Sequence, residues 1–296
     1  MKDIKNYETF VRIEPVNKGL SDDKKYYIET VNGEKLLLRV AGIDEYERKK
    51  AEYIMLEKVA LLDVIISRPV DFGICNDGKN VYSLLEWIDG KDVAEILPGL
   101  SEAEQYELGV KSGELLRKLH SIPAPNDTEN WGIRFKRKVQ NWLNGYNARP
   151  EAHSETGEMI IRYLEENSHV LEKCSQTFIH GDYNIENMIF TPDGEIGAID
   201  FNSFNSSYGD PWWDLNTMVW IEPFYPSFYT GQIRGLFNGE PPTEFWNVFS
   251  YYLAYDALAA ITEPYEANGI QDIMGLLQNI LSWTDHFRNP VPSWYF

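Results

Sequence analysis

The sequence contains little of what several classes of protein require. Cys75 and Cys174 are its two cysteines, too few for a disulfide scaffold, and no zinc-ligand spacing occurs. No apolar run approaches the length of a membrane span, and no P-loop pattern is present. The first residues lack the apolar stretch of a secretory leader. We therefore expect a cytoplasmic protein with reduced thiols and no membrane partner.

Positive charge is scarce in the second part of the chain. Residues 1–89 carry 14 Lys and Arg against 17 Asp and Glu, whereas residues 90–296 carry 13 against 29, a net charge of −16. Such an excess repels nucleic acid and attracts cations. We therefore expect no nucleic-acid partner. A cationic small molecule and plain solubility are both open explanations of the acidity.

The first 89 residues read as a small α+β domain. Alternating apolar residues predict strands, and a helix with Asp44 as its N-cap interrupts them. Asn32-Gly33 and Asn76-Asp77-Gly78 predict two turns, because these residues tolerate positive φ. The predicted strands are 9–13, 25–30, 35–40, 67–73 and 80–88, and the predicted helix is 44–62, with Tyr46, Ile54, Leu56, Val59 and Leu62 on its buried face.

Residues 90–296 read as mostly helical. Ser101 and Glu104 form a capping-box pattern at the start of the first helix. The predicted helices are 101–120, 134–146, 155–168, 214–221, 242–262 and 269–287, with a strand–loop–strand unit at 177–200. We therefore expect an N-terminal nucleotide-binding lobe at 1–89, a hinge at about 85–90, and a C-terminal catalytic and acceptor-binding lobe at 90–296.

Two short motifs carry the chemistry: HGDYNIEN at 180–187 and IDFN at 199–202. In phosphoryl transfer, one carboxylate orients the attacking hydroxyl while oxygen ligands hold Mg²⁺ on the nucleotide phosphates. Asp182 is the expected catalytic base, and Asn187 and Asp200 are the expected metal ligands. His180 is interpreted as a structural residue that fixes the loop. A polar turn between two strands would explain one of these acids but not all three polar groups.

The nucleotide should contact residues of the first lobe. Gly19 and Ser21 lie between the first two strands and could cover the phosphates. Arg39 ends an apolar strand, and we expect Glu52 on the next helix to hold its guanidinium against the phosphates. Glu57 and Glu47 are the alternative partners. The main chain of Glu86 and Ile88, at the junction of the lobes, could pair with the base.

With these motifs and GDPWWDL at 209–215, the chain resembles the aminoglycoside phosphotransferase family of antibiotic and choline kinase-like enzymes. The resemblance implies a bilobal protein-kinase-like fold: a small antiparallel-sheet lobe with one helix, then a larger, mostly helical lobe. It also implies ATP or GTP as donor, Mg²⁺ as cofactor and antibiotic resistance as a biological role. Two departures are Arg39 where the family usually has Lys, and Asn202 where Phe-Gly would place glycine.

The acceptor is expected to be an aminoglycoside-type antibiotic or a related cationic amino alcohol. The alternative acceptors are a macrolide, choline and a sugar. The alternative function is that of a nucleotide-binding pseudokinase. We expect Asp210 to brace the catalytic loop, Asp214 to cap the next helix, and the protein to be a monomer or weak dimer. Candidates for the acceptor pocket are Glu222, Asp256, Glu263, Glu266, the terminal carboxylate of Phe296, and the aromatic residues Trp212, Trp213, Trp220, Phe224 and Tyr225.

Overall fold

The computed structural model describes residues 2–17, 23–202, 206–262 and 273–296. They form two compact units: one comprises Met1–Pro98 with Glu186–Ser206, and the other Gly99–Ile185 with Ser207–Phe296. The chain therefore crosses between units three times, and the first crossing follows residue 98 rather than residue 89. The mixed α+β class, with a sheet-rich first unit and a helical second unit, agrees with the sequence prediction.

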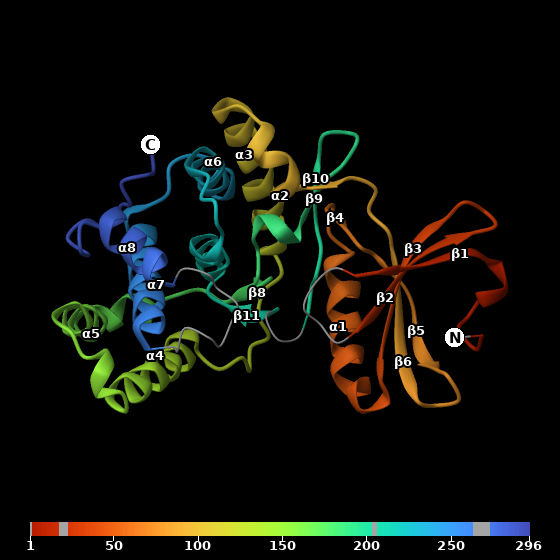
Figure 1. The fold of residues 1–296 in the computed structure, drawn as a ribbon, viewed down its shortest axis with the longest axis horizontal. Coiled ribbons are helices and arrows are strands. Elements are labelled where there is room, and N and C mark those ends of the chain that lie inside the picture. The colour runs from red at the N-terminus through yellow and green to blue at the C-terminus, as the bar shows by residue number, and fades with distance from the viewer. Residues whose placement is uncertain (1, 18–22, 203–205, 263–272) are drawn as a thin grey trace. The chain divides into compact units, whose positions relative to one another are not determined.

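The first unit is built on a five-stranded antiparallel sheet, with strand order β1-β2-β3-β6-β5 (Figure 1). The strands are β1 (Phe10–Val16), β2 (Lys24–Thr30), β3 (Lys35–Gly42), β5 (Pro69–Cys75) and β6 (Asn80–Glu86). Both predicted hairpin turns are confirmed. Gly33 has a φ of 80°, and Asn76, Asp77 and Gly78 have φ of 55°, 56° and 81°. These left-handed conformations are the ones that Asn and Gly adopt at little cost.

Alternation along β3 separates two faces of this sheet. Leu36, Leu38 and Val40 are buried in an apolar cluster on one face, so Arg39 points to the other face. Helix α1 (Tyr46–Val59) packs against β5 and β6. The sequence thus places one cation of β3 away from the apolar core.

The predicted N-cap of α1 is wrong, and its predicted buried face is confirmed at Leu56 and Val59 but not at Ile54. A short 3₁₀ turn, η2 (Ile43–Glu45), precedes the helix and makes Glu45 the N-cap, not Asp44. The buried residues of α1 are Lys49, Glu52, Leu56 and Val59. Ile54 is 43% exposed. The buried stripe keeps helical spacing but begins with two charged residues, which an apolar pattern does not detect.

Residues 186–206 join the first unit through a second sheet, with strand order β4-β10-β9-β7. Its strands are β4 (Ile65–Ile66), β7 (Lys91–Asp92), β9 (Met188–Phe190) and β10 (Ile196–Ala198). The β9–β10 hairpin pairs on one side with β4 and on the other with β7. This pairing explains why the segment 186–206, which contains the IDFN motif, belongs to the same unit as the N-terminal residues. The 3₁₀ turn η6 (Ile185–Asn187) precedes β9, and α2 (Val93–Ile96) and η3 (Leu97–Gly99) follow β7.

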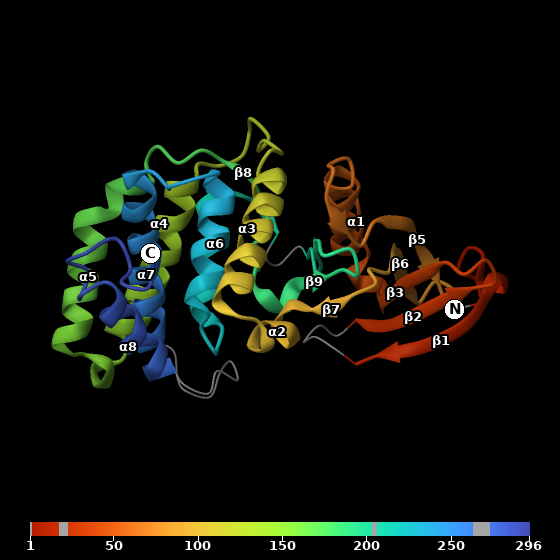
Figure 2. The same ribbon diagram turned by 90° about the horizontal axis from the view of Figure 1, so that it is seen from above.

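The second unit is mostly helical (Figures 1 and 2). Its helices are α3 (Glu102–Leu119), α4 (Trp131–Asn147), α5 (Glu155–Asn167), α6 (Pro226–Phe237), α7 (Thr243–Thr262), α8 (Ile273–Trp283) and the 3₁₀ helices η4 (Pro150–Ala152), η5 (Ser168–Leu171) and η7 (Pro211–Trp220). Helix α7, most of whose residues are buried, packs against α4, α5 and α8. A short sheet pairs β8 (Thr177–Ile179) with β11 (Ser207–Gly209). Among the helices described, none is long and apolar enough to cross a membrane.

Most predicted helices of this unit are confirmed, including the capping box at Ser101 and Glu104. The segment 214–221 lies within a 3₁₀ helix instead, and the predicted 269–287 helix ends at Trp283. Helix α6 was not predicted. Figure 2 shows it beside α3.

Glycines on both helices allow the α3–α6 approach. A Cβ on Gly113 would lie 2.0 Å from the carbonyl oxygen of Gln232, and one on Gly235 would lie 2.1 Å from that of Val110. These distances are far below van der Waals contact. The two backbones therefore pack as closely as they do because these positions carry no side chain.

Candidate active site

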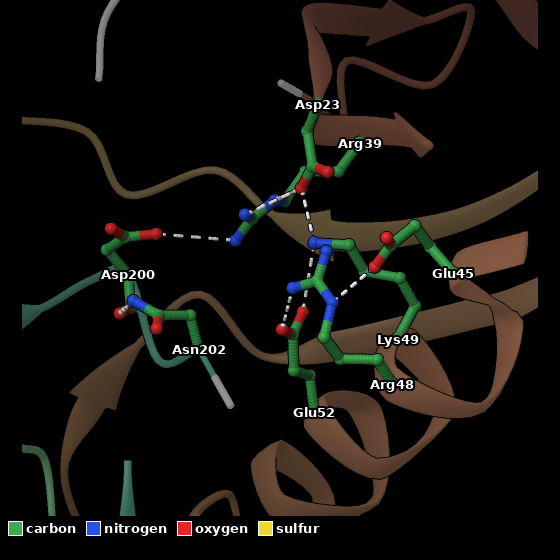
Figure 3. Close-up of polar contacts among 8 residues, drawn as sticks. All are labelled: Asp23, Arg39, Glu45, Arg48, Lys49, Glu52, Asp200 and Asn202. Carbon is green, nitrogen blue, oxygen red and sulfur yellow. Dashed lines mark hydrogen bonds and ion pairs between the residues drawn. The ribbon is translucent and has the colours of Figure 1, made fainter. Parts of the chain in front are cut away.

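In the first unit, the carboxylate of Asp23, the residue before β2, lies between two cations (Figure 3). Arg39 is 9% exposed, and its Nε and Nη2 donate to Asp23 Oδ2 at 3.0 and 2.7 Å. Lys49 Nζ donates to the same oxygen at 2.6 Å. Burial raises the pKa of Asp23, but the charges of Arg39 and Lys49 outweigh it, so the pKa is lowered. Asp23 is therefore a carboxylate held by a buried Arg and Lys.

The expected ion pair between Arg39 and Glu52 is not formed among the described residues. Glu52 accepts instead from Arg48 Nη1 at 2.8 Å and from Lys49 Nζ at 3.1 Å. Both cations lie three or four positions before Glu52 on the same helix, which brings their side chains onto one face. Lys49 thus takes the place beside Glu52 that we had assigned to Arg39. The spacing of three residues between Lys49 and Glu52 could have predicted this pair. No sequence pattern indicated that Asp23 would join it.

Arg39 also reaches the second metal-ligand candidate. Its Nη1 donates to Asp200 Oδ1 at 3.4 Å. Asp200 lies two residues after the end of β10 and has a φ of 62°, a left-handed conformation that Asp tolerates better than most residues. Asn202 Nδ2 donates to the carbonyl oxygen of Asp200 at 3.1 Å. The asparagine that replaces the usual glycine therefore stabilises this turn.

Asn187 and Asp200 lie at the same end of the β9–β10 hairpin. Met188 is paired with Ala198 in that hairpin, and one step further the N–H of Ile199 donates to the carbonyl oxygen of Asn187 at 3.0 Å. An amide and a carboxylate are oxygen donors of the kind that Mg²⁺ prefers. Clusters of three or more His, Cys, Asp or Glu that could hold a metal do not occur in the described part of the chain. A metal held by these two residues would complete its coordination with phosphate oxygens and water.

In the second unit, the residues around Asp182 are anchored to one buried carboxylate. Asp214 is fully buried and accepts from the N–H of His180 at 2.9 Å and from the N–H of Gly181 at 2.6 Å. His120 Nε2 lies 2.9 Å from the same carboxylate. Gly181 has a φ of 79°, so it makes a turn that other residues would resist. This anchor fixes the main chain immediately before Asp182.

Asp182 itself is held by its neighbours within the loop. Its N–H donates to His180 Nδ1 at 3.3 Å, which agrees with a structural role for that histidine. Asn184 Nδ2 donates to Asp182 Oδ1 at 2.7 Å, and Asn184 is 6% exposed. The hydrogen bond from Asn184 restricts the orientation of the Asp182 carboxylate. Asn184 belongs to the HGDYNIEN motif, but the motif alone predicts no role for it.

The roles predicted for Asp210 and Asp214 are reversed. Asp210 is the N-cap of η7, since its side chain accepts from the N–H of Trp212. Asp214 braces the loop, as described above. Both aspartates are buried, and both occur in one short sequence, so local pattern alone does not distinguish them. Their roles are decided by which backbone N–H groups the fold brings to each.

A tyrosine fastens the loop on its other side. Tyr183 is buried, its hydroxyl donates to the carbonyl oxygen of Ser112 on α3 at 2.8 Å, and burial raises its pKa. Thr217 Oγ1 donates to the carbonyl oxygen of Tyr183 at 2.9 Å. The buried Gln232 of α6 donates to Ser112 Oγ at 2.9 Å. The closely packed α3 and α6 thus support the loop that carries Asp182.

The hinge candidates differ in how their main chain is used. The N–H of Glu86 donates to the carbonyl oxygen of Arg68 at 2.8 Å, so it is engaged within the sheet. Trp87 continues the pairing with a bond to Lys35 at 3.0 Å. The main chain of Ile88 makes no hydrogen bond to other described residues. Gly19 and Ser21, the expected phosphate cover, lie outside the described residues.

Three of the expected acceptor residues lie in contacts within the second unit or at its surface. Trp213 packs edge-on against Phe135 and Tyr252 at centroid distances of 5.2 and 5.0 Å, as a core residue does. Asp256 is 2% exposed, accepts from Asn216 Nδ2 at 2.6 Å, and burial raises its pKa to about 8. Phe296 is 62% exposed. Glu263 and Glu266 lie outside the described residues.

The fold is shared with solved small-molecule phosphotransferases. Aminoglycoside 2′-phosphotransferase-IIIa with GDP matches with a TM-score of 0.64 and 16% identity, covering 95% of this chain and 94% of that one. The ternary complex of APH(2″)-IIa with streptomycin and ATP matches with a TM-score of 0.62 and 20% identity, covering 90% and 89%. A choline/ethanolamine kinase family protein from Mesorhizobium loti matches with a TM-score of 0.60 and 15% identity, covering 94% of this chain and 91% of that one. At these identities, the likeness establishes the fold.

The sequence itself also matches a family model. The model of the phosphotransferase enzyme family, APH, matches residues 12–246, and the chain belongs to that family.

Curated relatives resemble about half of this chain. Acyl-CoA dehydrogenase family member 10 of Mus musculus is 25% identical over 168 residues, and member 11 of Homo sapiens is 27% identical over 170 residues. The match covers 53% of this chain in both cases, but only 15% and 21% of those longer proteins. The similarity therefore concerns one segment of each relative.

Proposed function

We propose that this protein transfers the γ-phosphoryl group of ATP or GTP to a hydroxyl group of a small molecule. The observation that carries the proposal is the anchored loop at 180–184. Its main chain is bound to the buried Asp214, and the carboxylate of Asp182 is oriented by Asn184. Catalysis of this reaction consists mainly of positioning and charge stabilisation, which such a loop can supply.

Asp182 is the proposed base. Its carboxylate would accept a hydrogen bond from the acceptor hydroxyl and align that oxygen with the γ-phosphorus. As the new P–O bond forms and the bond to the nucleoside diphosphate breaks, the hydroxyl proton would pass to Asp182. His180 supports this step indirectly, because its ring accepts from the N–H of Asp182.

Asn187 and Asp200 are the proposed holders of Mg²⁺, which when bound would neutralise the charge of the nucleotide phosphates. Arg39 is the proposed cation toward the phosphates, a role supported by its burial and by its contact with Asp200. Glu52 would act through Lys49 and not through Arg39. The carbonyl oxygen of Glu86 and the main chain of Ile88 would bind the base, with Gly19 and Ser21 as the proposed cover of the phosphates.

The proposed acceptor is an aminoglycoside-type molecule or a related cationic amino alcohol. Two observations favour it: residues 90–296 carry a net charge of −16, and a solved structure of the same fold holds streptomycin with ATP. A macrolide, choline or a sugar would need the same loop and differ only in the acceptor pocket.

An acceptor screen tests the substrate class. Wild-type protein and Asp182→Ala would be incubated with ATP or GTP and amino sugars, macrolides, choline or neutral sugars, and phosphorylated products would be detected by mass spectrometry. We expect products from cationic acceptors with wild-type protein alone. Products from neutral acceptors only would contradict the cationic proposal. Nucleotide binding without any product would favour a pseudokinase.

A further inference from the structure

One carboxylate oxygen in the first unit accepts from three cationic donors. Asp23 Oδ2 lies 3.0 Å from Arg39 Nε, 2.7 Å from Arg39 Nη2 and 2.6 Å from Lys49 Nζ. The side chain of Asp23 is 4% exposed, and that of Lys49 is 6% exposed. Figure 3 shows this oxygen between the guanidinium and the ammonium group. The arrangement is that of a binding site for one anionic oxygen, built from β3 and α1.

The charge around this oxygen is balanced only while Asp23 is present. Arg39 and Lys49 have Asp200 and Glu52 as further partners. Lys25 adds a third cation, because it lies opposite Arg39 in the β2–β3 register; burial, and then the charge of Arg39, lower its pKa. Removing the carboxylate of Asp23 would therefore leave a surplus of positive charge in a poorly hydrated place, which binds anions strongly.

Lys49 is not needed to neutralise Glu52. Arg48 Nη1 donates to Glu52 Oε1 at 2.8 Å, closer than the 3.1 Å between Lys49 Nζ and Glu52 Oε2. Lys49 is nearer to Asp23 than to Glu52. If Lys49 turned toward another anion, Glu52 would keep a cationic partner on the same helix.

We propose that Lys49 is a second phosphate-binding cation beside Arg39, and that the carboxylate of Asp23 occupies the site of a nucleotide phosphate oxygen until the nucleotide displaces it. This inference rests on the proposed function. Ala41, Val81, Tyr82 and Ser83 surround these charged groups. Asp23 then competes with the phosphates, whereas Lys49 and Arg39 attract them.

The competition has an unusual consequence. Asp23→Asn keeps the shape of the side chain but removes its negative charge, so the nucleotide no longer has to displace a carboxylate. We expect Asp23→Asn to bind ATP about tenfold more tightly than the wild type, and Lys49→Ala to bind it about tenfold more weakly. Adenosine carries no phosphate, so its affinity should be the same in all three proteins.

Calorimetric titration with ATP and, separately, with adenosine tests this inference. Each result is the ratio of the two affinities, which does not depend on the fraction of folded protein. Lys50→Ala, on the exposed side of α1, and Glu29→Gln, on β2, are matched controls that should leave the ratio unchanged. Lys49→Arg should retain most of the ATP affinity.

The affinity ratios of the Asp23 and Lys49 variants decide whether the inference holds. A rise in the ATP-to-adenosine ratio for Asp23→Asn with a fall for Lys49→Ala supports the inference. A wild-type ratio in Lys49→Ala, or weaker ATP binding by Asp23→Asn, overturns it; if the wild type still transfers phosphate, the proposed function stands. A wild-type protein that binds no ATP contradicts both.

Discussion

The anchor of the loop at 180–184 yields a prediction whose size follows from the structure. Asp214 is fully buried and accepts hydrogen bonds from the N–H groups of His180 and Gly181. In Asp214→Asn, one of the two oxygens becomes an amide nitrogen, which donates and cannot accept. At least one main-chain N–H is then buried without an acceptor, and the contact with His120 loses its negative partner.

The cost of this change is on the order of 2–4 kcal/mol, since a hydrogen bond to a charged group contributes about 1.5–3 kcal/mol and a buried unpaired donor is expensive. Hydrogen exchange measured by NMR reads the anchor directly. We expect the amide protons of His180 and Gly181 to exchange about a hundredfold faster in the variant, while urea unfolding shows the same order of loss. Neither measurement needs a known acceptor.

Asp193→Asn is a suitable control, because Asp193 lies exposed in the turn between β9 and β10. It should change neither exchange nor stability. If Asp214→Asn retained the wild-type protection of both amides and unfolded within about 0.5 kcal/mol of the wild type, the anchoring role of Asp214 would be wrong.

Three further predictions concern packing, ionisation and loop orientation. Gly113→Ala should destabilise the protein by about 1–3 kcal/mol in urea unfolding, because the new methyl group would lie 2.0 Å from a carbonyl oxygen of α6. The control is Gly99→Ala, whose methyl group meets nothing within 4 Å and should leave stability nearly unchanged. Burial raises the pKa of Asp256 from 3.8 to about 8, so between these values the unfolded chain loses a proton that the folded chain keeps, and stability falls as pH rises. The fall in the free energy of unfolding would reach about 1.4 kcal/mol per pH unit, and Asp256→Asn should remove it when unfolding is compared at pH 5 and 8. If the variant's stability fell with pH as steeply as that of the wild type, this prediction would be wrong. Asn184→Ala should lower kcat about tenfold with little change in the KM for nucleotide, because it frees the proposed base to rotate; a change in KM alone would contradict this.

Local patterns were sufficient where a residue acts on its own neighbours. The hairpin turns and the capping box at Ser101 and Glu104 were predicted, because each depends on a few adjacent residues. The mixed α+β class likewise followed from periodicity, and the kinase-like fold from the motifs.

Predictions failed where distant contacts decide the structure. Helix α6 contains Gly231 and Gly235, which weaken helix propensity, yet both allow close packing against α3. The buried face of α1 begins with Lys49 and Glu52. Glu52 is balanced by cations of its own helix, whereas Lys49 also pairs with Asp23, which lies outside the helix. No spacing rule could have found Asp23, since its partner Arg39 is 16 residues away on the neighbouring strand.

The central claim is that this chain is a phosphotransferase whose base is Asp182. Phosphorus NMR of γ-phosphoryl transfer, with wild-type protein and Asp182→Asn compared at saturating nucleotide and acceptor, tests it most directly. We predict that the variant binds nucleotide with the wild-type Kd but transfers the phosphoryl group at least about a hundredfold more slowly. Transfer at the wild-type rate by Asp182→Asn would contradict the claim.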